Sequence, residues 1–246
     1  MPSLREIQSR IVSLRTTEKL TTAMKMISIT KYRRALQSFN ALDSFVKNFK
    51  ETTKYVKPIP QGQEKYLIVM ATERGLCGSL NTRLERFLKH QYSDYQIIII
   101  GKISHSKANV LSHPKESYIP YFQSVIDSLK DYGEIKLVYV HFDSTSKHTI
   151  KEEQIFPWDF DPEQDYFSMV EIQDFDQWFK DYLVHNLYAA FSHTHISENA
   201  SRMLAMDAAS KNAQKLIQEL RLFYNKKRQE LITKEIMETG VSIYGE

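Results

Sequence analysis

The sequence predicts an α/β protein in which two long terminal helices pair as an antiparallel coiled coil and a small α/β domain lies between them in the chain. Three observations support this prediction. Residues 3–57 and 163–239 contain neither glycine nor proline, the two residues that most penalise a helix interior. Apolar residues recur at helical spacing at both ends of the chain. Between the two ends, strand-like and helix-like patterns alternate.

The N-terminal helix is predicted from an apolar stripe of the coiled-coil type. Its first members follow one another at intervals of 3, 4 and 3 residues: Leu4, Ile7, Ile11 and Leu14. The same frame resumes at Tyr32, Ala35, Phe39, Leu42, Val46 and Phe49. In between, the frame positions are polar: Glu18, Thr21, Lys25 and Ser28. Because Leu20, Met24 and Ile27 form a displaced apolar stripe there, we expect the helix to change its contact face.

The C-terminal helix carries a comparable stripe, with alanines where a second helix could approach closely. Its members are Ile196, Ala200, Met203, Met206, Ala209, Ala213, Leu216, Leu220 and Phe223. We expect the two stripes to pack against each other. Since the α/β segment lies between the helices, the chain leaves along one and returns along the other, which makes the pair antiparallel.

The middle of the chain is predicted to form a small parallel α/β layer. The predicted strands are Tyr66–Ala71, Gln96–Ile100 and Glu134–Phe142, and the predicted helices are Leu80–His90 and Tyr121–Tyr132. We place the domain boundaries near the ends of the long helices. Residues 1–57 with 174–246 then form the coiled-coil shaft, and residues 58–173 form the α/β domain.

Composition narrows the possible functions. With one cysteine, Cys77, the chain can hold neither an intramolecular disulfide framework nor a cysteine-based zinc cage. Its longest apolar run, around Ile97–Ile100, is far shorter than the roughly 20 residues that span a bilayer. Residues 1–57 carry 12 lysines and arginines against 4 aspartates and glutamates. This excess indicates a nucleic acid, an anionic membrane or an acidic protein as partner, or a solvated helix face.

The segment 72–79 follows the first predicted strand, where a dinucleotide fingerprint would lie. It contains Gly75 and Gly78 but no preceding G-x-G pair and no P-loop lysine, so it predicts a tight strand-to-helix turn instead of a phosphate site. Cys77 has no catalytic base beside it in the sequence. We expect this cysteine to be structural or to contact a partner.

No catalytic site, cofactor or metal is predicted. His193 and His195 are two residues apart and project from different helix faces, which favours solvated histidines over a pair of metal ligands. The acidic run at 159–165 lacks the glycine and the final glutamate of a calcium loop and is expected to be a hydrated loop. No hydrolase triad, paired carboxylates or HExxH motif occurs at a recognisable spacing.

Three sets of residues resemble one known family. The N-terminal helix contains Ala23-Met24-Lys25-Met26-Ile27 and then Lys31-Tyr32-Arg33-Arg34. The 72–79 segment contains Arg74-Gly75-Leu76-Cys77-Gly78, with Asn81 beyond it. The C-terminal helix contains Glu198, Arg202-Met203, Ala205-Met206, Ala209, Asn212-Ala213, Tyr224-Asn225, Arg228-Gln229 and Ile232-Thr233-Lys234-Glu235. Together they resemble the γ subunit of F-type ATP synthases, closely at the helical ends and first strand and weakly over residues 103–180.

The resemblance implies an antiparallel coiled coil with a Rossmann-like α/β domain, and a role as a non-catalytic rotor shaft. In this family the coiled coil stands inside a ring of three α and three β subunits. The globular part sits with the ε subunit on the c-ring, and the δ subunit is an indirect partner. The resemblance implies no nucleic-acid partner and no cofactor, and it implies a membrane association that is peripheral, through the complex.

The resemblance also implies contact residues. Arg228 and Gln229 match positions that hydrogen-bond a loop of the β subunit, and Arg33 with Arg34 supply positive charge for an acidic β segment. Met24 either contacts a partner or packs within the coiled coil. The full predicted contact set with the ring is Met24, Lys25, Arg33, Arg34, Cys77, Arg228, Gln229 and Glu235.

Some features depart from the family pattern. Gly240 directly follows the last helical motif, where the family has a further small, apolar tip, so we expect an altered contact there. Residues 27–30 are bulkier than usual, and the cysteine-bearing insertion of chloroplast forms is missing, so thiol regulation is not expected. The family pattern begins by Leu4. This start favours the cytoplasmic face of a bacterial inner membrane over the matrix side of the mitochondrial one.

Two other functional classes stay open at this point. The basic N-terminal helix would suit a nucleic-acid-binding coiled coil, which a steep salt dependence of DNA binding would reveal. The α/β domain would suit a nucleotide-dependent enzyme, which a nucleotide titration would reveal.

Overall fold

The computed structural model describes residues 2–53, 56–60, 62–89, 92–103, 108–113, 118–158 and 175–243, without the side chains of residues 40–49, 52 and 239–243. The acidic run at 159–165 and the last three residues lie outside this description. The chain forms two compact units: Met1–Ile27 with Met203–Glu246, the helical unit, and Ser28–Arg202, the sheet unit. The predicted domain boundaries, after residues 57 and 173, follow the ends of the long helices and not the limits of these two units. They stay a prediction.

Two long helices dominate the described chain, α1 at Leu4–Thr52 and α4 at Phe175–Ile243. This confirms the prediction made from the two stretches without glycine or proline. A capping box starts α1: the N–H of Glu6 donates to Ser3 Oγ at 3.3 Å, and the N–H of Ser3 donates to Glu6 Oε2 at 3.0 Å. The box satisfies two backbone donors that the first helical turn leaves without partners.

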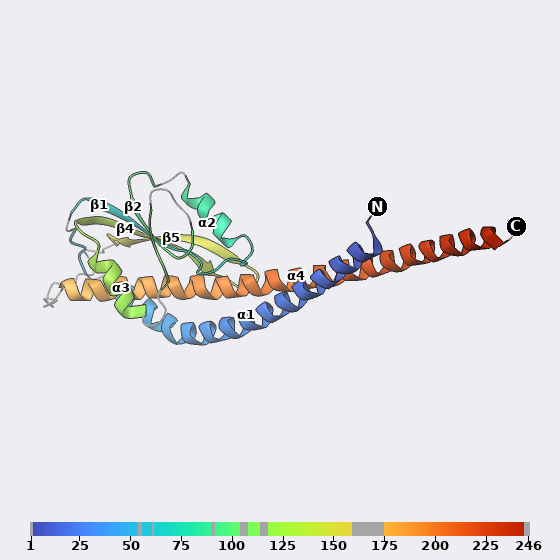
Figure 1. Cartoon of the computed structure of the whole chain (residues 1–246). Coiled ribbons are helices and arrows are strands. Elements are labelled where there is room, and N and C mark those ends of the chain that lie inside the picture. The colour runs from blue at the N-terminus through green and yellow to red at the C-terminus, as the bar shows by residue number, and fades with distance from the viewer. Residues whose placement is uncertain are drawn as a thin grey trace. The chain divides into compact units, whose positions relative to one another are not determined.

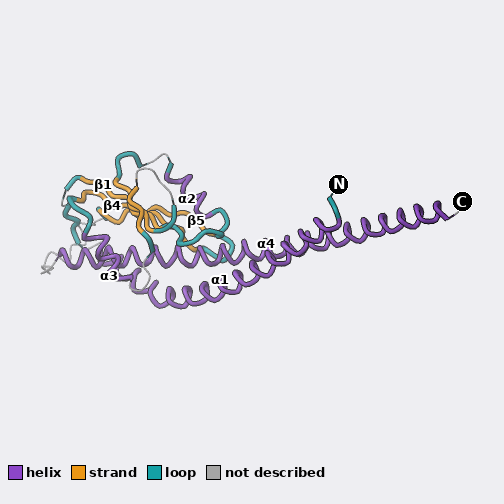
Figure 2. The backbone as a smooth tube through the Cα atoms, in the orientation of Figure 1, coloured by secondary structure: helices purple, strands orange, loops and turns teal. Residues whose placement is uncertain are grey.

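In the helical unit, α1 and α4 run side by side, and α4 continues past the N-terminus of α1 (Figure 2). Ile7 and Ile11 of α1 bury their side chains against Ile217 of α4. The stripe on α4 therefore differs from the predicted one at this level. Leu216 and Phe223, which were predicted to face α1, are 46% and 44% exposed.

The polar stretch of α1 keeps the same contact face, so the predicted change of face is wrong. Thr21, a polar frame position, is buried, whereas Leu20 and Ile27 of the displaced stripe are 60% and 58% exposed. The reason is that polar side chains of α4 lie opposite the polar frame. Hydrogen bonds across the helix pair replace apolar contact there.

The sheet unit contains one sheet of five strands in the order β3-β2-β1-β4-β5 within the described residues. The strands are β1 at Glu64–Met70, β2 at Gln96–Ile100, β3 at Ala108–Leu111, β4 at Tyr132–Phe142 and β5 at His148–Phe156. Strands β3, β2, β1 and β4 run parallel to one another, and β5 runs antiparallel to β4. The predicted layer is thus confirmed in its parallel part, but the sheet is mixed, and β3 and β5 were not predicted.

Helices cover both faces of this sheet (Figure 1). Helix α2, at Leu80–Leu88, packs on one face, where Leu84 belongs to a core cluster with Leu67 and Ile99. Helix α3, at Tyr118–Asp127, and the first part of α4 pack on the other face, where Phe122 and Phe179 are fully buried. The helix predicted for residues 121–132 therefore ends earlier, because residue 132 already begins β4.

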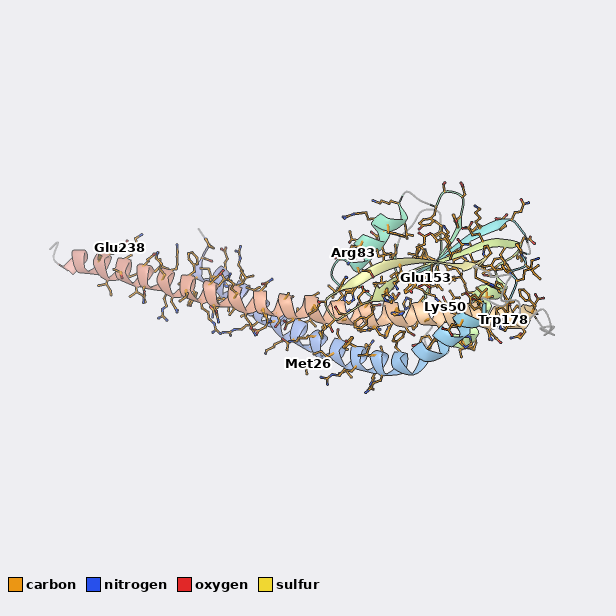
Figure 3. The ribbon with its side chains drawn as sticks, turned by 180° about the vertical axis from the view of Figure 1, so that it is seen from behind. Met26, Lys50, Arg83, Glu153, Trp178 and Glu238 are labelled. Carbon is orange, nitrogen blue, oxygen red and sulfur yellow. The ribbon has the colours of Figure 1, made fainter. Side chains whose placement is uncertain are left out.

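The second half of α1 belongs to the sheet unit and contacts the β4–β5 hairpin. Tyr32 lies against Phe142 with ring centroids 5.9 Å apart. Lys50 Nζ lies 2.7 Å from Glu153 Oε2 on β5, and both residues are labelled in Figure 3. These contacts hold the second half of α1 on strands β4 and β5.

Candidate functional site

The 72–79 turn lies at the carboxyl end of β1, where the strand order β3-β2-β1-β4 reverses direction. In doubly wound sheets this crevice is where ligands bind. Here, side chains of α4 enter it. The N–H of Val140, near the end of β4, donates to Thr194 Oγ1 at 3.2 Å, and Ser201 Oγ donates to the carbonyl of Cys77 at 2.7 Å.

Glu198 binds the backbone of the turn directly. Its carboxylate accepts hydrogen bonds from the N–H groups of Glu73, at 2.8 Å, and Arg74, at 3.2 Å. The side chain is almost completely buried. Phosphate-binding turns use backbone N–H groups of this kind as donors. A carboxylate of the chain itself therefore occupies the donors that a phosphate would need.

Arg202 balances the buried negative charge of Glu198. The two side chains, one helical turn apart, form an ion pair and are only 9% and 2% exposed. The guanidinium also donates to the carbonyls of Arg74, at 3.0 Å, and Gly75, at 3.2 Å. Since a buried ion pair is stable only when its remaining hydrogen-bonding groups are satisfied, these extra bonds hold the turn and the helix together as one network.

The fixed turn has an unusual backbone at its tip. Leu76 has a φ of 62° and Gly78 a φ of 64°. This left-handed region is disfavoured for a leucine, which persists there only when surrounding contacts hold the backbone. The side chain of Leu76 is nevertheless 62% exposed. The network around Glu198 thus holds a conformation that presents an apolar side chain on the surface.

Cys77, predicted as structural or as a partner contact, is 2% exposed. Its thiol lies 3.8 Å from Thr72 Oγ1, and Thr72 Oγ1 in turn lies 2.7 Å from Asn81 Oδ1. Burial raises the pKa of the Cys77 thiol, which lowers the fraction of reactive thiolate. The burial favours the structural role. A direct contact of the thiol with another subunit would require the turn to open.

Met24 and Lys25 lie in the helical unit, beside a row of polar pairs across the two helices. Lys25 Nζ lies 2.6 Å from Asp207 Oδ1. The other pairs in the row are Thr22 with Ser210, at 3.0 Å, and Gln214 with Glu18, at 2.6 Å. We call these six residues the polar seam. Met24 itself is partly buried.

Asp207 carries the strongest electrostatic effect in the polar seam. Hydrogen bonds from Lys211 and then Lys25 lower the pKa of its carboxyl to about 2. Lys211 Nζ lies 2.7 Å from Asp207 Oδ2, one turn along the same helix. Lys25 is therefore already engaged within the chain, and a partner of Lys25 would have to compete with Asp207.

The remaining predicted contact residues fall into separate groups. Arg33 and Arg34 are exposed on the part of α1 that belongs to the sheet unit. Arg228, Gln229 and Glu235 are exposed near the C-terminal end of α4, in the helical unit. Because 21 residues separate Asp207 from Arg228, about 30 Å of helix separates them. The structure does not bring the predicted residues into one site.

The C-terminal end of α4 exposes large apolar side chains along with Arg228 and Gln229. The exposed set is Leu222, Phe223, Leu231, Ile232, Ile236 and Met237. Leu222 is 73% exposed. A group of large, exposed apolar side chains on one helix is characteristic of an interface with another protein.

The described residues contain no group of three or more His, Cys, Asp or Glu side chains that could hold a metal ion. The prediction of solvated histidines is wrong. The ring of His193 lies 4.2 Å from that of His141 and 4.5 Å from that of Phe39, and His195 stacks on Phe191 at 5.7 Å. None of the described helices is long and apolar enough to cross a membrane.

Sequence reasoning missed the central pair of this site. Glu198 and Arg202 carried the family resemblance, but nothing in the sequence indicated that they bind the 72–79 turn, more than 120 residues away. Their spacing of four residues, with opposite charges on a face that is otherwise apolar, is the signal that could have suggested a buried pair.

Comparison with known proteins agrees with this architecture. The sequence model of the ATP synthase family matches residues 3–241. The ATP synthase gamma chain of Clostridium perfringens is 30% identical over 271 aligned positions, covering 96% of this chain and 95% of the relative. That of Geotalea uraniireducens is 29% identical, covering 97% and 96%.

Solved structures show the same fold. A chain from the mitochondrial ATP synthase of Euglena gracilis, in a structure of OSCP, F1 and c-ring, aligns with a TM-score of 0.81 at 19% identity, covering 98% of this chain and 94% of that one. A chain from the central stalk and c-ring of the Tetrahymena thermophila enzyme aligns with a TM-score of 0.60 at 21% identity, covering 78% and 99%.

The long helix pair and the mixed sheet, with α4 bound to the turn after β1, give the chain the fold of these ATP synthase chains. The chain belongs to the ATP synthase gamma chain family. It is thus a subunit of an enzyme complex. The complex is bound to a membrane, and this subunit is a peripheral part of it.

Proposed function

We propose that the chain is the rotor shaft that couples rotation of a membrane c-ring to conformational change at the catalytic β subunits, in ATP synthesis and hydrolysis. Family membership supports this role. The structural observation that carries it is the C-terminal end of α4, which continues past the N-terminus of α1 and exposes Ile232, Ile236 and Met237. A ring of α and β subunits would cover this apolar surface.

The mechanism follows from asymmetry. A single shaft presents different side chains on its different faces, so three chemically identical β subunits around it meet three different surfaces. Each β subunit is biased toward the conformation that its face of the shaft stabilises. Rotation exchanges the faces, and with them the nucleotide affinities of the three sites. The coupling ion is proposed to be the proton.

We assign the contacts with the ring to the predicted residues. Arg228 and Gln229 are exposed donors on the apolar end of α4 and would bind a loop of the β subunit. Arg33 and Arg34 would face an acidic segment of the ring. Met24, Lys25 and Glu235 complete the set. Cys77 would contribute by shaping the 72–79 turn, since its thiol is buried.

The chain itself is proposed to be non-catalytic and to bind no cofactor. The crevice at the end of β1 supports this, because Glu198 already occupies the backbone donors of Glu73 and Arg74. The nucleotide chemistry would belong to the β subunits.

The sheet unit would sit with the ε subunit on the c-ring, with the δ subunit as an indirect partner. The complex is proposed to work at the cytoplasmic face of a bacterial inner membrane, with the matrix side of the mitochondrial inner membrane as the alternative. The bacterial relatives at about 30% identity support the first location.

Co-expression with all other subunits of the cognate complex, the membrane part included, tests the proposal. We expect one complex that contains a single copy of this chain, and ATP-driven proton pumping only when the chain is present. The purified chain should hydrolyse no ATP. A stable monomer with ATPase activity, or a complex that pumps protons without the chain, would overturn the proposed function.

A further inference from the structure

The sheet unit contains a second hollow, separate from the 72–79 crevice, with a volume of about 530 Å³. Its walls come from α1, the beginning of the 72–79 turn, the start of α3 and α4. The volume falls in the range of about 300–1,000 Å³ typical of small-molecule sites. We call this hollow the α1–α4 pocket.

The α1–α4 pocket is lined by three cationic side chains, Lys31, Arg34 and Arg74. Lys31 and Arg34 lie three residues apart on one face of α1. Among the described residues, no carboxylate lies within ion-pair distance of either of them, whereas Arg74 has Glu73 at 3.8 Å. Glu73 is the one acidic residue of the lining. The pocket therefore carries a net positive charge.

His195 lines the α1–α4 pocket without offering it a free donor. Its Nδ1 is buried and has no hydrogen-bond partner among the described residues, so a ligand in the pocket does not reach this atom. Burial has the largest effect on the pKa of His195 and lowers it; Glu198 raises it, and His113 and Lys31 lower it. The ring can therefore report on a charge that is placed near Lys31.

The other side of the α1–α4 pocket is aromatic and pre-formed. Tyr118 packs against Phe191 at 4.8 Å and against Tyr188 at 5.9 Å. These rings hold one another in place without a ligand. Three cationic side chains around one space match the chemistry of a phosphate group.

We propose that the α1–α4 pocket binds the phosphate group of a small anion, held by Lys31, Arg34 and Arg74. This site is additional to the rotary function, which does not require it. The phosphate group could belong to an inorganic anion or to a nucleotide. In the second case the aromatic wall would contact the base.

The test uses the full chain and the imidazole signal of His195 in NMR spectra, assigned through His195→Gln. A bound anion favours the protonated ring, so the titration midpoint of His195 should rise when phosphate, pyrophosphate or AMP is added at constant ionic strength. Tighter binding of pyrophosphate than of AMP identifies an inorganic anion. The reverse order identifies a nucleotide. Either order supports the site.

A matched pair of variants separates the α1–α4 pocket from general surface charge. Lys31→Gln with Arg34→Gln should weaken binding by about tenfold or more, because two charge-assisted contacts are lost. Arg86→Gln with Lys89→Gln removes the same charges from the exposed surface around α2 and should leave the affinity within about twofold. All four positions lie on the surface or at the pocket rim, and thermal unfolding of each variant checks that it folds.

Two results would overturn the proposal. The first is an unchanged His195 midpoint with all three anions at about 10 mM, which would nearly saturate a site with a millimolar Kd. The second is an equal loss of affinity in both double variants, which would mean nonspecific attraction to a basic surface.

Discussion

Glu198 and Arg202 form an almost completely buried ion pair on α4, and both side chains bind the backbone of the 72–79 turn. The pair joins the C-terminal helix to the first parallel strand. Breaking such a pair on one side leaves an uncompensated charge in a low-dielectric environment.

We expect Glu198→Gln to lower the free energy of unfolding by about 3–5 kcal/mol, because the Arg202 cation stays buried without its partner. The double variant Glu198→Gln with Arg202→Met should lose clearly less than the sum of the two single variants. The measurement is urea unfolding of the full chain, with the coupling taken from the double-mutant cycle.

Lys234 and Glu238 provide the control, since they form an ion pair at the same spacing on the same helix but are 69% and 65% exposed. Lys234→Ala should cost no more than about 0.5 kcal/mol. If the effects of the Glu198 and Arg202 substitutions add up within about 0.5 kcal/mol, the two side chains do not act as a pair.

The sequence could predict the 72–79 turn and the helix that contains Glu198, but not the contact between them. Glycine spacing indicated a tight turn at residues 72–79, and periodicity indicated a helix through Glu198. Whether a charged residue within a helix faces solvent or a buried turn depends on contacts between distant segments. A single sequence contains no direct record of those contacts.

The thiol of Cys77 should report on the same turn. Its burial and raised pKa both slow alkylation. We expect iodoacetamide to modify Cys77 in the native chain at least about tenfold more slowly than in urea, and Arg202→Met to increase the native rate. Since Cys77 is the only cysteine, the extent of modification can be read by mass spectrometry. A native rate within about twofold of the rate in urea would show that the turn opens freely.

The helical unit allows a test of register. Ile217 is 5% exposed, whereas its neighbour Leu216, which was predicted to face α1, is 46% exposed. We expect Ile217→Ala to cost about 2–5 kcal/mol of unfolding free energy and Leu216→Ala less than about 1 kcal/mol. Urea unfolding of both variants measures this difference. Equal losses would contradict the register of the helix pair.

This register error has a physical cause. Leu216 and Ile217 are both apolar, and each lies three or four residues from Ala213 and from Leu220. Helical spacing alone therefore does not decide which of the two faces α1. The polar frame of α1 was misjudged for a different reason. Glu18 and Lys25 stay at the interface because Gln214 and Asp207 bind them across the pair.

The polar seam should make the folding stability of the chain depend on pH in the acidic range. The folded pKa of Asp207, about 2, lies below its ordinary value of 3.8. Its contribution to stability is therefore fully present above about pH 4 and is lost as the pH falls through about 2. We expect Asp207→Asn to remove this part of the pH dependence, measured as urea midpoints between about pH 2 and 5.

The lysines around Asp207 can be ranked in the same experiment. Lys211 has the larger effect on this carboxyl and Lys25 the smaller one. The NMR titration midpoint of Asp207 should accordingly rise more in Lys211→Ala than in Lys25→Ala. An Asp207 midpoint at the ordinary value in the unmodified chain would contradict the seam.

Strand β5 shows another limit of sequence reasoning. Its central residues are Lys151, Glu152 and Glu153, which break the alternation that predicts a strand. The structure supplies polar partners on its one neighbouring strand, β4. Glu153 accepts a hydrogen bond from Tyr139 Oη at 2.7 Å, and Glu152 lies 3.0 Å from Lys136 Nζ. An edge strand with charged side chains also resists pairing with other chains.

The contact assigned to Arg228 and Gln229 leads to the sharpest functional prediction. Both side chains are exposed on the apolar end of α4. If they bind a loop of the β subunit at only some rotary angles, replacing both by alanine removes about 1.5–3 kcal/mol from those states alone. Assembly should persist, because the apolar residues around them still fill the ring.

Membranes that carry Arg228→Ala with Gln229→Ala should therefore show normal subunit content on gels, but slower ATP hydrolysis or proton pumping that is uncoupled from it. The matched control is Gln218→Ala with Arg221→Ala, an equally composed and exposed pair on the same helix. This control should keep both rates, since neither residue has an assigned contact. If the variant with both Arg228→Ala and Gln229→Ala keeps both rates within about twofold of the unmodified enzyme, the loss corresponds to roughly 0.4 kcal/mol. This is too little for a charge-assisted contact, so the assignment to Arg228 and Gln229 would be wrong.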